Sequence, residues 1–204
     1  MDTIALTDIR YGLAAILVVL LPVVIVFWVT IHGAVSFWKS RPMWQAYTAA
    51  LLLMLATATP VLWRLDAIIG QDLGTLPGLF VVGTIIYFTS WRMSARIRPH
   101  LDLRTFSGIP EVQGEAEALI EAGPFSVVRH PRYFMIIVGT IGWAIAANYS
   151  GAYVISGLFF LALYLVIQME ENELVGRFGD KYRNYKTRVP MVFPRLKRIG
   201  QLFA

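Results

Sequence analysis

Four long stretches of this sequence contain no lysine, arginine, aspartate or glutamate, and they constrain the fold more than any other feature. They are residues 11–37, 42–63, 73–91 and 133–169. A bilayer core requires about 20 apolar residues for each helix that crosses it, and every stretch supplies roughly that length. Within lipid, a helix satisfies its own backbone hydrogen bonds. The stretches therefore predict an all-α membrane protein.

The fourth stretch is too long for a single crossing. Its 37 residues would form a helix of about 55 Å, whereas the hydrocarbon core is about 30 Å thick. Residues 148–151 supply turn-forming side chains near its middle. The sequence thus predicts a polytopic protein with five transmembrane helices, the last two a tight hairpin. The predicted spans are 12–31, 44–63, 74–92, 133–148 and 152–169.

The distribution of positive charge predicts the orientation of the chain. With five spans, every lysine and arginine other than Arg10 and Arg64 falls on one side of the membrane. Because positively charged loops remain in the cytoplasm, we expect an outside amino terminus and a cytoplasmic carboxyl terminus. The membrane would be the inner one if the chain is bacterial. Two acids and one base precede the first span, so this span is expected to be a permanent helix.

Composition excludes several classes of function. Only 15% of the residues are charged, against about 25% in a soluble domain, which excludes an ordinary soluble enzyme. The net charge of +5 is explained by membrane topology, so no nucleic-acid partner is expected. The chain has no cysteine, and its three histidines, His32, His100 and His130, lie in separate segments. We therefore expect no metal site.

Two segments outside the spans are long enough to carry a site, residues 93–129 and 170–204. The first contains an acidic, helix-forming run at 111–122, which Gly123 and Pro124 terminate. Helical spacing in the second places one set of apolar residues on a single face, with a stop and restart at Gly179. That set is Leu174, Phe178, Tyr182, Tyr185 and Val189. Each segment is also explained as a surface or interfacial amphipathic helix.

Two polar motifs flank the predicted hairpin: GPFSVVRHPRY at 123–133 and EENELVGRFGDKYRNYKTRVP at 170–190. The hairpin would bring both to one membrane boundary, where polar groups are costly to desolvate and often functional. Taken singly, these residues have simple roles as charge anchors, helix entries and aromatic-belt residues. Together they resemble the isoprenylcysteine carboxyl methyltransferase and phospholipid methyltransferase superfamily, whose members are integral membrane enzymes that use S-adenosyl-L-methionine.

The resemblance implies methyl transfer to a lipid or small hydrophobic acceptor, within the membrane lipids. It implies that Glu170 holds the charged methionyl end of the cofactor and that Arg129 orients the substrate or the cofactor carboxylate. If the acceptor is an amine or a thiol, Glu171 and His130 are the candidate bases. The further cofactor-binding residues that it implies are Glu117, Ala118, Leu119, Ile120, Phe125, His130, Pro131, Arg132 and Tyr133.

The resemblance also divides the chain. Residues 1–92 would form three transmembrane helices, and residues 93–204 the catalytic part, with a cytoplasmic loop, the hairpin 133–169 and cytoplasmic carboxyl-terminal helices. Prenylcysteine enzymes carry an arginine one turn before the first glutamate, where this chain has Val166. A carboxylate in a lipid-lined pocket needs a cationic partner, so a prenylcysteine carboxylate is a disfavoured substrate.

Two further departures from the family pattern are Met135, where many relatives have glycine, and Met191, where relatives often have arginine. Two alternative functions remain open at this point. One is an NADPH-dependent membrane reductase of the sterol reductase type. The other is a non-enzymatic or haem-associated membrane protein.

Overall fold

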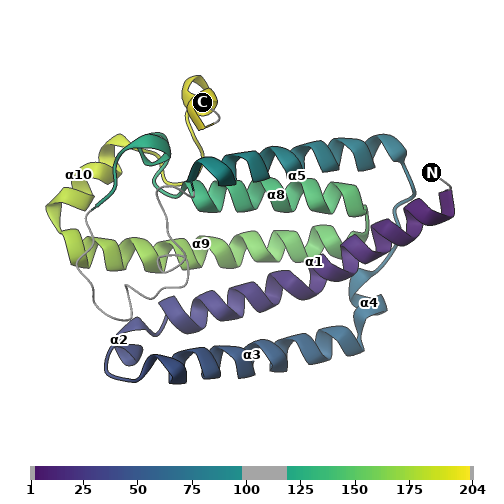
Figure 1. The fold of residues 1–204 in the computed structure, drawn as a ribbon, viewed down its shortest axis with the longest axis horizontal. Helices are drawn as coiled ribbons and strands as arrows, with labels where there is room; N and C mark the ends of the chain where they lie inside the picture. Colours follow the sequence, from purple (N-terminus) through teal and green to yellow (C-terminus); the bar gives the residue numbers. More distant parts are fainter. Residues whose placement is uncertain (1–2, 98–118, 203–204) are drawn as a thin grey trace.

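The structure is a computed structural model that describes residues 3–97 and 119–202 (Figure 1). Within these residues the chain is helical, apart from an isolated bridge between Asp72 and Tyr149, which confirms the predicted all-α class. The long helices are α1 (Thr3–His32), α3 (Met43–Trp63), α5 (Pro77–Ile97), α8 (Pro131–Ala147) and α9 (Ser150–Phe178). The short ones are α2 (Val35–Trp38), α4 (Leu65–Ile69), α10 (Asp180–Arg188) and the 3-10 helices η2 (Gly123–Ser126) and η3 (Leu196–Leu202).

Three of the described helices are long and apolar enough to cross a membrane, in α1, α3 and α9. The helix α8 is apolar but has 17 residues, and α5 has 21 residues but a more polar second half that includes Arg92. Both α3 and α9 expose rows of large apolar side chains, such as Leu52 and Leu161. Contiguous apolar surface of this kind is typical of lipid contact. The protein is therefore a membrane protein, and the count of five spans stays a prediction.

The long helices lie side by side, with α1 crossing the others obliquely (Figure 1). Helices α5 and α8 approach each other closely at small residues. A Cβ atom added to Gly142 would lie 2.6 Å from the backbone nitrogen of Tyr87, and one added to Gly83 would lie 2.4 Å from that of Ala146. Glycine at such positions lets two helix backbones approach closely in a membrane. Helix α1 contacts α3, α8 and α9, and so connects α3 to the rest of the bundle.

One end of the bundle is held together by Arg10, which is 1% exposed. Its guanidinium donates to the carbonyls of Ala147 at 3.1 Å and Asn148 at 3.2 Å. It also pairs with the carboxylate of Asp72. Because these partners compensate a buried charge, α1 begins at Thr3, well before the predicted start of the first span at residue 12. We call this end of the bundle the Arg10 end.

The breaks after α8 and α9 fall at residues with a left-handed backbone. Asn148 has a φ of 52° and separates α8 from α9, within the predicted turn. Gly179 has a φ of 56° and separates α9 from α10, which confirms the predicted stop and restart. Glycine adopts this conformation without steric cost. Helix α9 therefore continues past the predicted end of its span at residue 169, as far as Phe178.

We expect Gly142→Leu to lower the free energy of unfolding by about 1–3 kcal/mol, because the new side chain collides with the α5 backbone. Thermal unfolding of the protein in detergent measures this change. Gly157→Leu is the matched control, since nothing lies within 4 Å of a Cβ atom at Gly157 on α9. Equal melting temperatures for the two variants would contradict the proposed close contact between α5 and α8.

A second prediction concerns Asp72, whose pKa is held below its ordinary value of 3.8 by the hydrogen bond from Arg10. A carboxyl with a lowered folded-state pKa contributes stability that is present above its unfolded pKa and is lost as the pH falls through the folded one. We expect Asp72→Asn to lower the melting temperature at neutral pH, and the difference from the unmodified protein to shrink below pH 3.8. A difference independent of pH would contradict this assignment.

Candidate functional site

Three segments meet where α8 begins and α9 ends, toward the left of Figure 1. In the first turn of α8, the Tyr133 hydroxyl donates a hydrogen bond of 2.7 Å to Glu170 Oε2 on α9. The backbone N–H of Arg129 donates to the Pro190 carbonyl over 2.8 Å. The backbone N–H of His130 donates to the Met191 carbonyl over 2.9 Å. The segment after α10 therefore closes onto the segment before α8. We call this end of the bundle the site end.

Glu171 is the centre of a buried ion cluster at the site end and is 2% exposed. Its Oε1 lies 2.6 Å from Arg129 Nη2 and 3.2 Å from His130 Nε2, and its Oε2 lies 2.8 Å from Lys186 Nζ. The Tyr182 hydroxyl is 3.4 Å from the same Oε1. Because burial of an unpaired carboxylate is very costly, these partners are what allows Glu171 to remain ionised there. Its hydrogen-bonding capacity is used within the protein.

The neighbouring carboxylate, Glu170, has a different environment. Its Oε2 accepts from Tyr133, its Oε1 lies 3.9 Å from His130 Nδ1, and its side chain is 23% exposed. The Arg132 guanidinium donates to the Tyr133 hydroxyl over 3.0 Å and lies over that ring, 4.9 Å from its centre. A carboxylate and a guanidinium thus flank one tyrosine at the surface of the site. This pair matches a ligand that carries both a positive and a negative group.

The tyrosines of α10 close the site from the other side. The Tyr185 hydroxyl donates to the Phe125 carbonyl. Burial raises the pKa of both Tyr182 and Tyr185, so both phenols stay protonated donors at neutral pH. The helical face predicted from the sequence is confirmed as one apolar cluster. Its members are Leu174, Phe178, Tyr182, Tyr185 and Val189, with Leu119 and Val175 packed against them.

The structure gathers most of the residues that the sequence singled out. Those brought together at the site end are Arg129, His130, Pro131, Arg132, Tyr133, Glu170 and Glu171. Phe125 lies beside them through its bond with Tyr185. Leu119 packs on the α10 cluster, whereas Ile120 is exposed. Glu117 and Ala118 lie outside the described residues.

Sequence reasoning missed the contributions of α1 and Lys186. The Trp28 ring packs edge-on against Tyr133, with ring centres 5.5 Å apart, and the Arg132 guanidinium lies 5.9 Å from the Trp28 ring. His32 lies one helical turn further along α1. The positions i and i+4 share one face of a helix, but nothing in a charge-free stretch indicates which face meets the site. Lys186 was counted only among the basic residues of an amphipathic helix.

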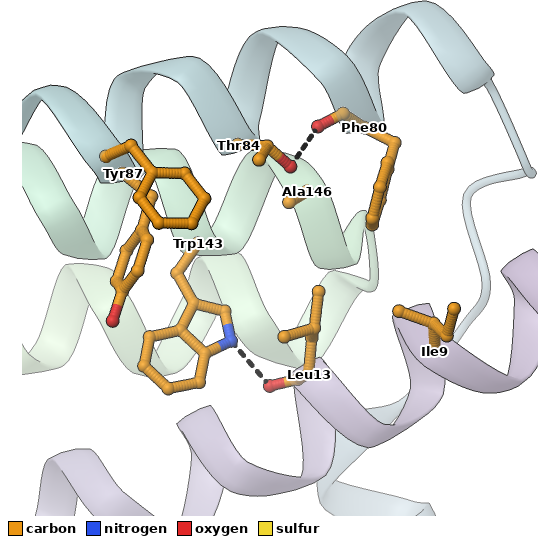
Figure 2. Close-up of a pocket in the computed structure, with 8 residues that line it drawn as sticks. Ile9, Leu13, Phe80, Thr84, Tyr87, Trp143 and Ala146 are labelled. Carbon is orange, nitrogen blue, oxygen red and sulfur yellow. Dashed lines mark hydrogen bonds between the residues drawn. The ribbon is translucent and has the colours of Figure 1, made fainter.

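Apolar cavities lie between α1, α5 and α8. Figure 2 shows one of about 280 Å³, beside Trp143, whose indole N–H donates to the Leu13 carbonyl over 2.9 Å. A second cavity of about 320 Å³ shares Tyr87 and Trp143 with the first and extends to Trp28. Small-molecule sites have volumes of about 300–1,000 Å³, so the second cavity is large enough for a compact apolar group. It connects the apolar flank of the bundle with the aromatic side of the site.

Val166 is buried in the apolar core, with an exposed fraction of 1%. It occupies the position at which a prenylcysteine enzyme carries an arginine. Its side chain packs among apolar residues of the main core.

Comparison with known proteins finds similarity to methyltransferases and to a metal-resistance protein. The family model described as phospholipid methyltransferase matches residues 77–181. A methanethiol S-methyltransferase of Crocosphaera subtropica is 28% identical over 160 residues, which cover 71% of this chain and 56% of that protein. Methanethiol S-methyltransferase 1 of Bradyrhizobium diazoefficiens is 36% identical over 70 residues, covering 34% of this chain and 24% of that protein.

A nickel-cobalt-cadmium resistance protein of Alcaligenes xylosoxydans xylosoxydans is also similar, with 32% identity over 78 residues that cover 38% of this chain and 37% of that protein. The chain thus spans about a quarter to a little over half of the length of these curated relatives. No solved structure matches the chain. The family match includes α5, α8 and α9 but not α1.

The ion cluster predicts the effect of removing one charge. We expect Glu171→Gln to lower the free energy of unfolding by on the order of 2–3 kcal/mol, because it leaves buried cations without their counter-charge. Thermal unfolding in detergent is the measurement. The matched control is Asp180→Asn, which removes a carboxylate that is 89% exposed and paired only with Arg183 among the described residues. A control as destabilised as Glu171→Gln would argue against the cluster's structural role.

Proposed function

The chain belongs to the phospholipid methyltransferase family, and on this premise we propose that it transfers a methyl group from S-adenosyl-L-methionine to a small hydrophobic acceptor. The observation that carries the proposal is the meeting of two sequence motifs around Glu170. One motif supplies His130 and Tyr133, the other the carboxylate itself. Every long-range contact among them connects residues about 40 positions apart, as the hairpin hypothesis requires.

The charged side chains at the site end match the charges of the cofactor. S-adenosylmethionine carries an ammonium, a sulfonium and a carboxylate. We propose that the partly exposed Glu170 holds the positive groups and that Arg132 faces the carboxylate, since charge-assisted hydrogen bonds are the strong ones. Glu171 is the less suitable ligand, because its oxygens already bind Arg129, His130 and Lys186. When bound, the cofactor supplies an electrophilic methyl group on a positively charged sulfur.

The remaining predicted residues receive roles that agree with their contacts. We propose that Pro131 and Phe125 line the cofactor pocket, and that the stretch 117–120 contacts the cofactor through its backbone. Arg129 and Glu171 were expected to act in catalysis. Their mutual contact favours a positioning role, in which they fix His130 and the carboxyl-terminal segment relative to α8.

In methyl transfer of this kind, the protein mainly aligns the donor with the acceptor and excludes water. The buried faces of Tyr133 and Trp28 provide a rigid aromatic wall for that purpose. Positive charge is lost from sulfur along the reaction, so a weakly polar surrounding favours it. The Trp28 part of this wall lines the second cavity, whose lining is largely apolar.

Three observations favour a thiol as the acceptor. Two of the three relatives described above are named methanethiol S-methyltransferases. The cavity that reaches Trp28 is apolar and small, at about 320 Å³. At residue 166, where prenylcysteine enzymes carry an arginine, this chain has a valine and so no cation for a carboxylate acceptor. We therefore propose a small hydrophobic thiol, with lipid headgroups and prenylcysteine carboxylates as competing acceptors to be tested.

The membrane arrangement follows as part of the proposal. We propose that α1, α3, α5, α8 and α9 all span the membrane, with the site end in the cytoplasm, where a water-soluble cofactor is available. The excess of lysine and arginine at the site end supports this orientation. Residues 93–204 would form most of the catalytic part, completed by Trp28 of α1.

Calorimetry of the detergent-solubilised protein with S-adenosylhomocysteine tests the cofactor assignment. We expect Glu170→Gln to weaken this binding about 10- to 100-fold, because one charged hydrogen bond is worth about 1.5–3 kcal/mol. Asp180→Asn is the matched control and should bind as the unmodified protein does. Binding of NADPH without binding of S-adenosylhomocysteine would overturn the proposal in favour of a reductase.

A second experiment identifies the acceptor. The unmodified protein is given radiolabelled S-adenosylmethionine with methanethiol, with a prenylcysteine or with phosphatidylethanolamine vesicles. We expect label to appear only in the methylated thiol. Label in the vesicle lipid or in a methyl ester would replace the thiol by that acceptor.

A further inference from the structure

The proposed reaction needs a base, and the two candidates named from the sequence already contact other charged groups. A thiolate, not a thiol, is the effective nucleophile, and an alkyl thiol is mostly protonated at neutral pH. Glu171 contacts Arg129 and Lys186, and its Oε1 lies 3.2 Å from His130 Nε2. The other ring nitrogen of His130 faces Glu170 at 3.9 Å. Glu171 therefore has no open position for a proton from the acceptor, and His130 has one only at Nδ1, beside the carboxylate that we assign to the cofactor.

His32, at the end of α1, has such a position. Both of its ring nitrogens are shielded from solvent, and neither has a hydrogen-bond partner among residues 3–97 and 119–202. A buried polar group without a partner costs about 1–3 kcal/mol, and such groups call for an explanation. The cost is understandable if the imidazole is reserved for a ligand.

The surroundings place His32 at the site. Its ring lies close enough to Glu170 and Arg132 to interact electrostatically with both. The next residue, Gly33, is pressed against α9: a Cβ atom there would lie 2.7 Å from the Met169 methyl carbon, next to Glu170 in the chain. The end of α1 thus lies beside the α9 residue that precedes the carboxylate assigned to the cofactor.

Helical spacing connects His32 with the cavity. Trp28 precedes it by one turn on the same face of α1, packs on Tyr133 and lines the cavity of about 320 Å³. A compact apolar molecule that enters from the flank of the bundle and reaches Trp28 would present its polar end within one turn of His32. That distance along the helix axis is about 5–6 Å.

We propose that His32 is the base that accepts the thiol proton of the acceptor. This inference rests on the proposed function. The sulfur–hydrogen bond breaks and its proton passes to an unpartnered imidazole nitrogen. The electron pair left on sulfur forms the new bond to the methyl carbon, while the bond from that carbon to the sulfonium breaks and its pair remains on the departing sulfur. The products are a methyl thioether, neutral S-adenosylhomocysteine and protonated His32.

His32→Gln removes the base and keeps a polar side chain of similar size. With an alkyl thiol, we expect kcat to fall about 100-fold or more, as is typical for loss of general base catalysis. Calorimetry with S-adenosylhomocysteine should give an affinity within about twofold of the unmodified protein, because His32 is not assigned to the cofactor. Val29→Ala, a change at an exposed neighbour on α1, is the matched control and should leave both values unchanged.

Activity with an aromatic thiol distinguishes a role of His32 as a base from a purely structural role. Such a thiol is already ionised at mildly alkaline pH and needs no base, so the deficit of His32→Gln should shrink to about threefold or less with it. A deficit of equal size with both thiols, an undiminished kcat, or a loss of affinity for S-adenosylhomocysteine as large as the loss of kcat would each overturn the assignment of His32.

The same measurements distinguish the two levels of the proposal. If the unmodified protein methylates thiols and His32→Gln does so equally well, only the role of His32 is wrong. If the unmodified protein neither binds S-adenosylhomocysteine nor methylates any of the acceptors, the proposed function and the role of His32 are both wrong.

Discussion

The contact between Glu171 and Arg129 holds the site end together. A carboxylate that is 2% exposed is stable only where cations compensate it, and Arg129 and Lys186 come from segments on either side of the α8–α9 pair. One ionised group therefore fixes the start of α8, the end of α9 and α10 relative to one another. The backbone pairing between Arg129 and Pro190 follows from the same closure.

This closure separates two adjacent glutamates into different roles. Successive residues on a helix point about 100° apart, so Glu171 faces the ion cluster while Glu170 faces Tyr133 and retains partial exposure. The buried carboxylate of Glu171 contacts Arg129, His130 and Lys186, and these contacts stabilise the fold. The neighbouring one keeps the partial exposure that its proposed role with the cofactor requires. The candidate site thus gains a fixed carboxylate without a flexible element of its own.

Both ends of the bundle contain an arginine close to a carboxylate, but the two arrangements differ in how much of the charged groups remains accessible. At the Arg10 end, a buried guanidinium binds Asp72 and the carbonyls of the α8–α9 turn, and little of its capacity remains for a ligand. At the site end, Arg132 and Glu170 are held against tyrosine but stay accessible. Helix α1 reaches both ends, with Arg10 at one and Trp28 at the other. It therefore determines how far apart the two ends lie.

The sequence by itself determined the helices and their breaks. Charge-free stretches must be helical in lipid, a residue such as Gly179 permits the left-handed backbone at a break, and the spacing from Leu174 to Val189 defines one apolar face. It also determined that Glu170, His130 and Tyr133 belong together, because two motifs flank one hairpin. The extension of the first helix to Arg10 and beyond was not predicted, since the partners of Arg10 are distant in the sequence. Only the tertiary structure decided that Glu171 is occupied by Arg129 and Lys186, and that Trp28 and His32 face the site. The physical reason is that an apolar helix carries no pattern that selects its neighbour in a membrane: the rotation of α1 about its own axis is determined by close packing, as at Gly33 against Met169, and not by the local sequence.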